Sequence, residues 1–429
     1  MKKIVLLSCL SAIGCLHAQF NVQIKIPAEF NEKEAILYTL NGSKDIISSK
    51  GKVVNNTLTV KYPTRYLGMM KVYFPNTNNT LNFISENKDV SIVVETKGNN
   101  KISKIQYLDD ANNAMNETQK LAEKKEIILP ALAQITEYYN DNSSFAKALS
   151  TEMDRLGKPL TFNSDQHPFI NFYYNGYNKF LSKKGGKEKP SQDEIINYID
   201  KAGDMLESSS LMRPILVEYL NGGGNTNIDG SVDKILGKLN VETPRGQVVL
   251  SELIEIFDVY AMSETKEKYL SYAKNLKCTI NDRLNMTIKS NDNIALGATF
   301  QNYDFKSPLH TKAKSLYDVK ANNKIVVFWS STCSHCESEL PQLLKVYNEL
   351  KSKNVEIVGF SLDTSKDAFL TKAGVFPWIN DTELKGWNSD IVNTYNLLAT
   401  PTYFILDANN KIINKPDRVG DVLTYFKLK

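Results

Sequence analysis

From Phe20 to about Lys97, apolar and polar residues alternate along the chain with a period of two. The stretch opens with FNVQIKI and continues as short runs rich in β-branched and aromatic residues, separated by Asn, Gly and Pro. Such alternation, broken by turn residues, is typical of half-buried strands in an all-β domain. We therefore predict an antiparallel β-sandwich over residues 19–105, and we find no catalytic cluster in it.

Between residues 106 and 290, apolar residues recur at spacings of three and four, which is the period of amphipathic helices. Two helix starts are marked clearly. Ser191 is followed three residues later by Glu194, as in a capping box, and Thr243 is followed by Pro244. We predict a helical region whose aromatic and leucine stripes form core, and no residue in it identifies a ligand.

Residues 291–429 alternate strand and helix signals. The apolar run KIVVFW predicts a buried strand at 325–329, LPQLLKVYNEL places leucines on one helical face, and VEIVGFSLD predicts a strand at 355–362. Together these form a right-handed parallel unit. The segment TPTYFILDANNKII predicts two more strands joined by a turn at Asn409 and Asn410. The predicted fold class is therefore multi-domain, with a β-sandwich, a helical middle and a C-terminal α/β domain over 291–429.

The charge balance and the hydropathy of the chain exclude two classes of partner, nucleic acids and the interior of a membrane. Lysine and arginine number 52 and aspartate and glutamate 48, and both signs are mixed along the 429 residues. Without a basic block, no nucleic-acid partner is expected. After the first twenty residues, no apolar run approaches the roughly 18–20 residues that span a bilayer, so we expect a soluble mature protein.

The first residues, MKKIVLLSCLSAIGCLHAQF, have a basic start, an apolar stretch and small residues at the end. This layout predicts a secretory signal peptide over residues 1–18, cleaved after Ala18. The alternative is a loose lipoprotein box, AIGC, which would make Cys15 a lipidated first residue. In either case we expect an exported protein.

The number and spacing of the cysteines show which roles these residues can have: structural disulfide, metal ligand or redox pair. Of five cysteines, only Cys278, Cys333 and Cys336 lie beyond the predicted leader. Three thiols make no stabilising framework, and a bridge between Cys333 and Cys336 would close a very short loop. A zinc site is not expected, because no second C-x-x-C or paired histidine accompanies His335. We expect no metal, and we interpret Cys278 as a small buried side chain.

The pair Cys333 and Cys336 falls where the strand at 325–329 gives way to the next helix. Free N–H groups and a partial positive charge at a helix N-terminus favour a thiolate, so the pKa of Cys333 is expected below its free value of about 8.5. Cys333 should be the attacking sulfur, and Cys336, one turn on and facing inward, should resolve the mixed disulfide. C-x-x-C after a strand of an α/β unit is typical of thioredoxin-like proteins.

The stretch VVFWSSTCSHCESELPQL resembles the active-site region of the TlpA/ResA-type branch of the thioredoxin superfamily. The shared residues are Trp329, four before Cys333, Glu339, three after Cys336, and Pro341. The segments LGATFQNYDF at 296–305 and ATPTYFILD at 399–407 resemble other ordered motifs of these domains, over about residues 291–429. The order of the three predicted parts also resembles exported thiol-disulfide oxidoreductases of Bacteroidetes-type bacteria, which implies the periplasm or cell envelope.

The resemblance implies a thiol-disulfide oxidoreductase whose only redox group is the Cys333–Cys336 disulfide, without another cofactor. It implies that Pro401 is cis and faces this disulfide. The implied catalytic residues are Cys333, Cys336, Glu339 as a proton carrier and His335 as an influence on the thiolate, and the implied substrate-binding residues are Thr400, Pro401 and Trp329. Expected partners are protein thiols or disulfides and a membrane or periplasmic electron donor, and the front regions are expected to recruit partners or form a homodimer.

The sequence departs from relatives at Thr332, where tryptophan is common, and in its inner Ser-His dipeptide. The direction of disulfide exchange is therefore open. We favour a reductase, but a charged His335 would stabilise the Cys333 thiolate and make the protein more oxidising, so an oxidase or isomerase is the alternative. A peroxide-reducing enzyme of the same superfamily would typically have threonine where Ser330 stands. A non-catalytic thioredoxin-like binding or structural protein is the remaining alternative.

Overall fold

The computed structural model describes residues 20–98, 100–139, 142–158, 162–182, 190–223 and 227–428. The predicted signal peptide, including Cys15 and Ala18, lies outside these residues. The chain divides into two compact units, one of Met1–Pro190 and Lys201–Pro214, the other of Ser191–Asp200 and Ile215–Lys429. This grouping differs from the expected boundaries at 105 and 290, which stay predictions.

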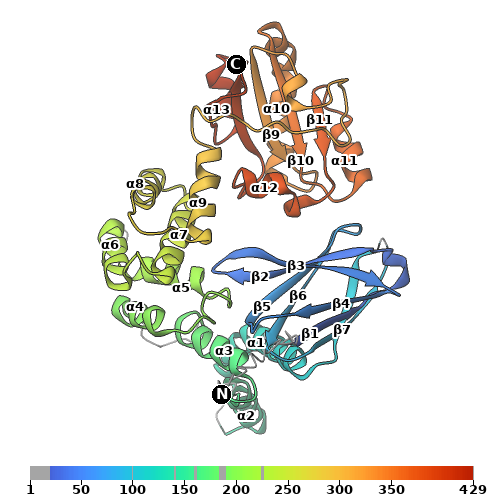
Figure 1. Cartoon of the computed structure of the whole chain (residues 1–429). Helices are drawn as coiled ribbons and strands as arrows, with labels where there is room; N and C mark the ends of the chain where they lie inside the picture. The colour runs from blue at the N-terminus through green and yellow to red at the C-terminus, as the bar shows by residue number, and fades with distance from the viewer. Residues whose placement is uncertain are drawn as a thin grey trace, which may run out of the picture. The chain divides into compact units, whose positions relative to one another are not determined.

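The first unit contains one eight-stranded sheet in the order β6-β5-β2-β3-β4-β1-β7-β8 (Figure 1). Its neighbours are antiparallel except β1 and β7, which pair in parallel. The antiparallel prediction is wrong for that pair, because β1 and β7 are joined by a long crossover rather than a hairpin. The strands are β1 (Phe20–Lys25), β2 (Glu34–Asn41), β3 (Lys44–Val54), β4 (Thr57–Tyr62), β5 (Leu67–Phe74), β6 (Asn79–Glu86), β7 (Val90–Thr96) and β8 (Ile102–Tyr107).

One hydrophobic core serves this whole sheet. Phe20, Val22 and Ile24 alternate with more exposed residues along β1, and they share a buried cluster with Leu81 of β6 and Ile92 of β7. Because strands from both ends of the order bury side chains together, the sheet folds over its own core. The sandwich prediction is not confirmed as two separate sheets, since β3 pairs with both β2 and β4.

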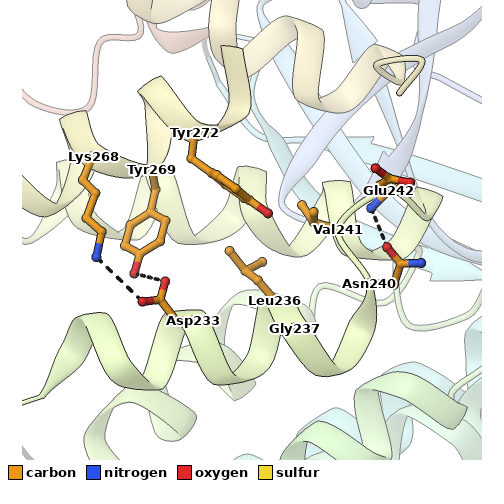
Figure 2. A pocket seen from close by; sticks show the side chains of 9 residues that line it. All are labelled: Asp233, Leu236, Gly237, Asn240, Val241, Glu242, Lys268, Tyr269 and Tyr272. Atoms are coloured by element: carbon orange, nitrogen blue, oxygen red, sulfur yellow. Dashed lines mark hydrogen bonds and ion pairs between the residues drawn. The ribbon is translucent and has the colours of Figure 1, made fainter. Parts of the chain in front are cut away.

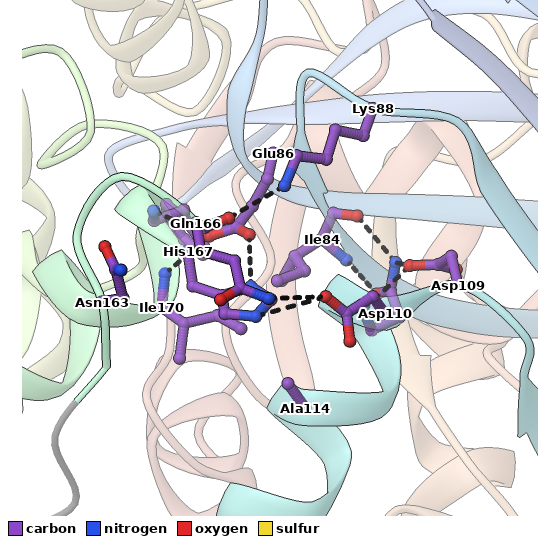
Figure 3. Close-up of polar contacts among 12 residues, drawn as sticks. Ile84, Glu86, Lys88, Asp109, Asp110, Ala114, Asn163, Gln166, His167 and Ile170 are labelled. Carbon is purple, nitrogen blue, oxygen red and sulfur yellow. Dashed lines mark hydrogen bonds and ion pairs between the residues drawn. The ribbon is translucent and has the colours of Figure 1, made fainter.

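Three helices, α1 (Asp110–Thr136), α2 (Ser144–Gly157) and α3 (Pro168–Phe180), belong to this unit. A buried carboxylate joins two of them to the sheet (Figure 3). Oε1 of Glu86, at the end of β6, accepts hydrogen bonds from the N–H groups of Phe169 (2.9 Å) and Ile170 (3.1 Å). Oε2 lies 2.9 Å from Nδ1 of His167, whose Nε2 lies 3.4 Å from Oδ2 of Asp110. This network fixes the starts of α1 and α3 against β6.

The predicted helical middle is confirmed as helices, but its residues are shared between the units. The later helices are α4 (Gln192–Lys201), α5 (Met212–Gly222), α6 (Ile228–Leu239), α7 (Pro244–Val259), α8 (Ser263–Lys274) and α9 (Asp282–Asn293). Both predicted helix starts are confirmed, by Ser191 bonding Glu194 and by Thr243 capping Gly246 N–H. The segment around Ser208 returns to the first unit because its carbonyl accepts from Met69 N–H of β5 at 2.8 Å.

The C-terminal part of the second unit is an α/β domain whose five-stranded sheet has the order β11-β10-β9-β12-β13 (Figure 1). Strands β9 to β11 are parallel, and β12 is antiparallel to β9 and β13. The predicted strand, helix and strand from 325 to 362 are confirmed, as are the two strands after Pro401. The elements are β9 (Asn323–Trp329), α10 (Ser334–Ser352), β10 (Val355–Ser361), α11 (Lys366–Ala373), β11 (Ile379–Thr382), α12 (Asp390–Thr394), β12 (Thr402–Asp407), β13 (Ile412–Asn414) and α13 (Val419–Tyr425).

The apolar run of β9 is explained by burial on both faces. Ile325, Val327 and Trp329 join one core with side chains of α10 and α13, whereas Val326 and Phe328 join a second core with side chains of α12. A parallel strand covered on both faces has no polar side. The carboxyl end of β9 is therefore held rigidly from both sides, and the cysteines follow directly after it.

Candidate active site

The thiol of Cys333 lies at the start of α10. Cys333 is the N-cap residue of this helix, and its Sγ accepts a hydrogen bond from the Cys336 N–H at 3.1 Å. The preceding turn is closed by Cys333 N–H donating to the Ser330 carbonyl at 3.2 Å. The predicted position at a strand-to-helix junction is confirmed, and it brings an orphan helix N–H onto the sulfur.

The Thr400–Pro401 turn lies against this sulfur. The Thr400–Pro401 peptide bond is cis, as the resemblance implied. The Thr400 carbonyl oxygen is 3.1 Å from Cys333 Sγ and accepts its thiol proton. Residues 67 positions apart in sequence thus meet at one point, at the start of β12 beside the end of β9.

The pKa values of the two thiols shift in opposite directions. Partial burial raises the pKa of Cys333, but hydrogen bonds with Cys336, Thr400 and the backbone N–H groups of Cys336 and His335 outweigh it, so the pKa is lowered. Cys336 is only 2% exposed, and burial together with its contact to Cys333 raises its pKa to about 12. Cys333, Cys336 and Cys278 are all free thiols in this structure. The arrangement therefore combines a partly exposed thiol whose pKa is lowered with a buried thiol whose pKa is raised.

This difference predicts the pH dependence of alkylation. Because the pKa of Cys333 is lowered, its thiolate persists below the pH at which an ordinary cysteine, with a pKa of about 8.5, becomes protonated. We expect iodoacetamide to modify Cys333 of the reduced protein first, with a rate that rises with pH and is half-maximal below about pH 8.5, while Cys336 stays unmodified. Peptide mass spectrometry measures both. Equal rates at both cysteines, or a midpoint at or above that of free cysteine, would contradict the assignment.

Glu339 lies on α10 and is engaged by two other elements. Its Oε2 accepts from the Tyr403 hydroxyl of β12 at 3.1 Å and from the Val419 N–H of α13 at 2.7 Å. Burial raises the pKa of Tyr403, and the charges of Glu339 and then of both cysteines raise it further. Tyr403 therefore stays a hydroxyl donor between Glu339 and the thiols. The predicted proton exchange between Glu339 and Cys336 stays a prediction.

A carboxylate that the sequence analysis missed holds the turn before Cys333. Asp363 follows β10 and is 3% exposed. Its Oδ1 accepts from Ser330 Oγ (3.0 Å), Ser331 N–H (2.9 Å) and Ser331 Oγ (2.7 Å), and its Oδ2 accepts from Ser361 Oγ (2.7 Å). Hydroxyl and amide donors satisfy this buried carboxylate, so it fixes the turn that carries Cys333. Its only signal in the sequence is a polar residue at the carboxyl end of a parallel strand.

The remaining predicted residues lie at different depths. His335 is exposed in the first turn of α10. Trp329 is 1% exposed, and its ring meets Phe376 edge-on at 5.8 Å between centroids. The indole forms part of the wall of an apolar cavity of about 160 Å³ beside Cys336, rimmed by the Glu337–Lys372 ion pair. A direct contact between Trp329 and a substrate stays a prediction.

A cavity of about 540 Å³ lies away from the cysteines, between α6 and α8 (Figure 2). Its polar side chains bond one another: Lys268 lies 3.9 Å from Asp233, and the Tyr269 hydroxyl donates to Asp233 at 2.8 Å. It contains no thiol. Among the described residues, no cluster of three or more His, Cys, Asp or Glu side chains could hold a metal ion. No helix in the described part of the chain is long and apolar enough to cross a membrane.

Comparison with known proteins agrees with this site. Residues 297–415 match the model of the AhpC/TSA family. The thiol-disulfide oxidoreductase ResA of Bacillus anthracis is 31% identical over 111 residues, which cover 25% of this chain and 61% of that protein. ResA of Bacillus subtilis (strain 168) is 27% identical over 133 residues, 30% of this chain and 71% of that protein. The chain thus spans 61% of the length of the first curated relatives it matches.

Two solved structures are each similar to 31% of this chain. The thioredoxin domain of a thiol-disulfide oxidoreductase from Bacteroides vulgatus is 27% identical, with a TM-score of 0.28, and covers 31% of this chain and 97% of that one. A domain of a possible thiol-disulfide isomerase from Cytophaga hutchinsonii is 26% identical, with a TM-score of 0.28, and covers 31% and 91%. The likeness to ResA-type proteins that the cysteine region predicted is confirmed by the sequence matches.

Proposed function

We propose, from the premise that residues 297–415 form a thioredoxin-like domain, that this chain is an exported thiol-disulfide oxidoreductase acting on other proteins. One observation carries the proposal. Cys333 Sγ lies within 3.1 Å of both the Cys336 N–H and the carbonyl before cis Pro401, while Cys336 is buried one turn further along α10. A pair built for stability would not need one accessible sulfur with a lowered pKa.

In the reducing direction, the Cys333 thiolate attacks one sulfur of a partner disulfide. The partner S–S bond breaks, a bond forms between Cys333 and the partner, and the other partner sulfur leaves as a thiolate that takes up a proton. Cys336 then loses its proton and attacks Cys333 Sγ. The Cys333–Cys336 bond forms, the second partner thiol leaves, and two electrons have passed to the partner. The Glu339–Tyr403 pair is proposed to receive the Cys336 proton, because Tyr403 bonds Glu339 and its pKa responds to the charges of both cysteines.

The Thr400–Pro401 turn is proposed to seat the partner. Pro401 has no N–H, and the Thr400 carbonyl already faces the reacting sulfur. A partner strand that pairs beside this turn would bring its own sulfur in line with Cys333. Trp329 and His335 are proposed to shape this surface, His335 through its exposed position in the same helical turn.

The compartment and the electron donor are part of the proposal. The leader at residues 1–18 supports export to the periplasm or cell envelope, with cleavage after Ala18 or lipid attachment at Cys15. In an oxidising compartment the Cys333–Cys336 disulfide needs a dithiol donor to become reduced again, in the membrane or the periplasm. The front regions are proposed to recruit partners or to dimerise.

Equilibration of the pair with glutathione buffers, on a chain with Cys278→Ser, tests the direction. We expect a potential near about −270 mV, in the range of thioredoxin, for a reductase, whereas a value above roughly −180 mV would indicate an oxidase or isomerase. Oxidation of the dithiol by hydrogen peroxide at a rate far above that of free cysteine would instead favour a peroxide-reducing enzyme. The Ser330 hydroxyl, at the position where such an enzyme would typically have threonine, is bonded to Asp363.

A further inference from the structure

A cavity of about 250 Å³ lies between α1 and α3 in the first unit. Residues that recur every three or four positions on α1 face it, because such residues share one side of a helix. Three tyrosines of α3 form the opposite wall. The lining residues are Gln119, Ala122, Glu123, Glu126, Tyr173, Tyr174 and Tyr177.

The three rings form a corner. The rings of Tyr173 and Tyr177 are nearly parallel, with 10° between their planes and 6.4 Å between centroids. The ring of Tyr174 stands almost at right angles to Tyr173, at 83° and 5.3 Å. Tyr174 is only 4% exposed and stacks on Phe162, so this part of the corner is fixed by the core. Corners of aromatic rings concentrate the negative potential of the ring faces.

Carboxylates add to this potential. Oε1 of Glu126 accepts from the Tyr177 hydroxyl at 2.5 Å, and this bond, together with burial and the charge of Glu126, raises the pKa of Tyr177 to about 12. Glu123 adds a second charge, one of the causes that raise the pKa of Tyr174 after burial. Over the ranges that the structure describes, no lysine or arginine forms an ion pair with Glu123 or Glu126. The neighbouring Lys125 bonds the carbonyl of Lys158 at 2.5 Å instead.

The cavity keeps room beside the rings and leaves its carboxylates without a cation from the described part of this chain. We propose that it binds an organic cation, an alkylated ammonium or a guanidinium group, held by the tyrosine faces and by Glu123 and Glu126. The cation comes either from a lysine or arginine side chain of a polypeptide or from a small quaternary ammonium solute. This site is independent of the cysteines and of the proposed redox activity.

Titration of the full chain with tetramethylammonium, followed by calorimetry and by the aromatic NMR signals, tests the proposal. We expect saturable binding that weakens with added salt, and no binding of 3,3-dimethylbutan-1-ol, the neutral isostere of choline. We expect Tyr173→Phe to bind nearly as wild type, because it keeps the ring, and Tyr173→Leu to bind at least roughly fivefold more weakly. Glu123→Gln with Glu126→Gln should weaken binding roughly tenfold and remove most of its salt dependence. Glu117→Gln, an exposed change on α1 outside the cavity lining, is the matched control and should bind as wild type.

The affinities of two further probes, choline and a short peptide amide that contains lysine and arginine, distinguish the two sources of the cation. Tighter binding of the peptide indicates a polypeptide partner, and tighter binding of choline indicates a solute. Circular dichroism confirms that each variant is folded. The proposal is overturned if no cation binds saturably, if the neutral isostere binds equally well, or if folded Tyr173→Leu binds as wild type.

Discussion

Replacing Cys336 by serine is expected to stop turnover and to accumulate a mixed disulfide between Cys333 and the partner. The first attack needs only the Cys333 thiolate, whose stabilising N–H donor is the backbone of residue 336 and survives the substitution. The second attack needs the Cys336 sulfur, which serine cannot supply as a nucleophile. With a disulfide-linked peptide as substrate, non-reducing mass spectrometry should show the trapped adduct and no released second thiol.

Replacing Cys333 by serine is expected to abolish both steps. Cys336 is 2% exposed, and its burial, which also raises its pKa, remains when Cys333 is replaced, so Cys336 cannot replace Cys333 as the attacking group near neutral pH. Cys278→Ser is the matched control, because this thiol belongs to the segment between α8 and α9, and we expect it to leave the rate unchanged. A mixed disulfide through Cys336 in the Cys333→Ser chain would show that the roles of the two cysteines are reversed.

Removing the charge of Arg283 is expected to destabilise the second unit more than a change at any surface ion pair. Its guanidinium is buried between α7 and α9, with Nη2 2.8 Å from Glu252 Oε1 and Nη1 2.9 Å from Glu255 Oε1. Nη1 also donates to Thr287 Oγ1 at 2.6 Å. Arg283→Met removes a guanidinium that bonds two buried carboxylates, and breaking a buried ion pair costs about 3–5 kcal/mol of unfolding free energy. Urea unfolding followed by circular dichroism measures this loss.

A matched surface substitution separates burial from charge. Arg155 forms an exposed ion pair with Glu152 on α2, and Arg155→Met should lower the unfolding free energy far less than Arg283→Met, because solvent screens an exposed pair. Adding Glu252→Gln and Glu255→Gln to Arg283→Met should recover part of the loss, because the two buried carboxylate charges that Arg283 had bonded are then neutralised. Equal effects of Arg283→Met and Arg155→Met would refute the view that this network holds the helices together.

Much of the C-terminal domain could be predicted because its signals are local. The strand 325–329 is a continuous apolar run, the helix after it has one apolar face, and the cysteines lie between them. That order alone places Cys333 at a helix N-terminus. The partner turn could be predicted only through the resemblance, since Cys333 and Thr400 are 67 positions apart and no periodic pattern joins them.

The missed features are long-range hydrogen bonds. Asp363 reads in the sequence as one polar residue after a strand, yet it bonds Ser330 and Ser331 some thirty residues earlier. Tyr403 occupies an ordinary core position of β12, and only its hydroxyl, which donates to Glu339, gives it a place in the site. The segment around Ser208 is joined to β5 by backbone hydrogen bonds, which cannot be predicted from a pattern of side chains. The parallel pairing of β1 and β7 was missed for the same reason.

The central claim is that Cys333 and Cys336 interconvert between dithiol and disulfide as one two-electron pair. In the most direct measurement, the Cys278→Ser chain is equilibrated in glutathione buffers of graded redox ratio and quenched with an alkylating reagent. The mass of the intact protein is then measured by mass spectrometry. The account predicts that both thiols disappear together at one midpoint, with no lasting glutathione adduct. Two thiols that stay reactive at every ratio, or that oxidise separately, would contradict it and would favour a thioredoxin-like domain that binds partners without exchanging disulfides.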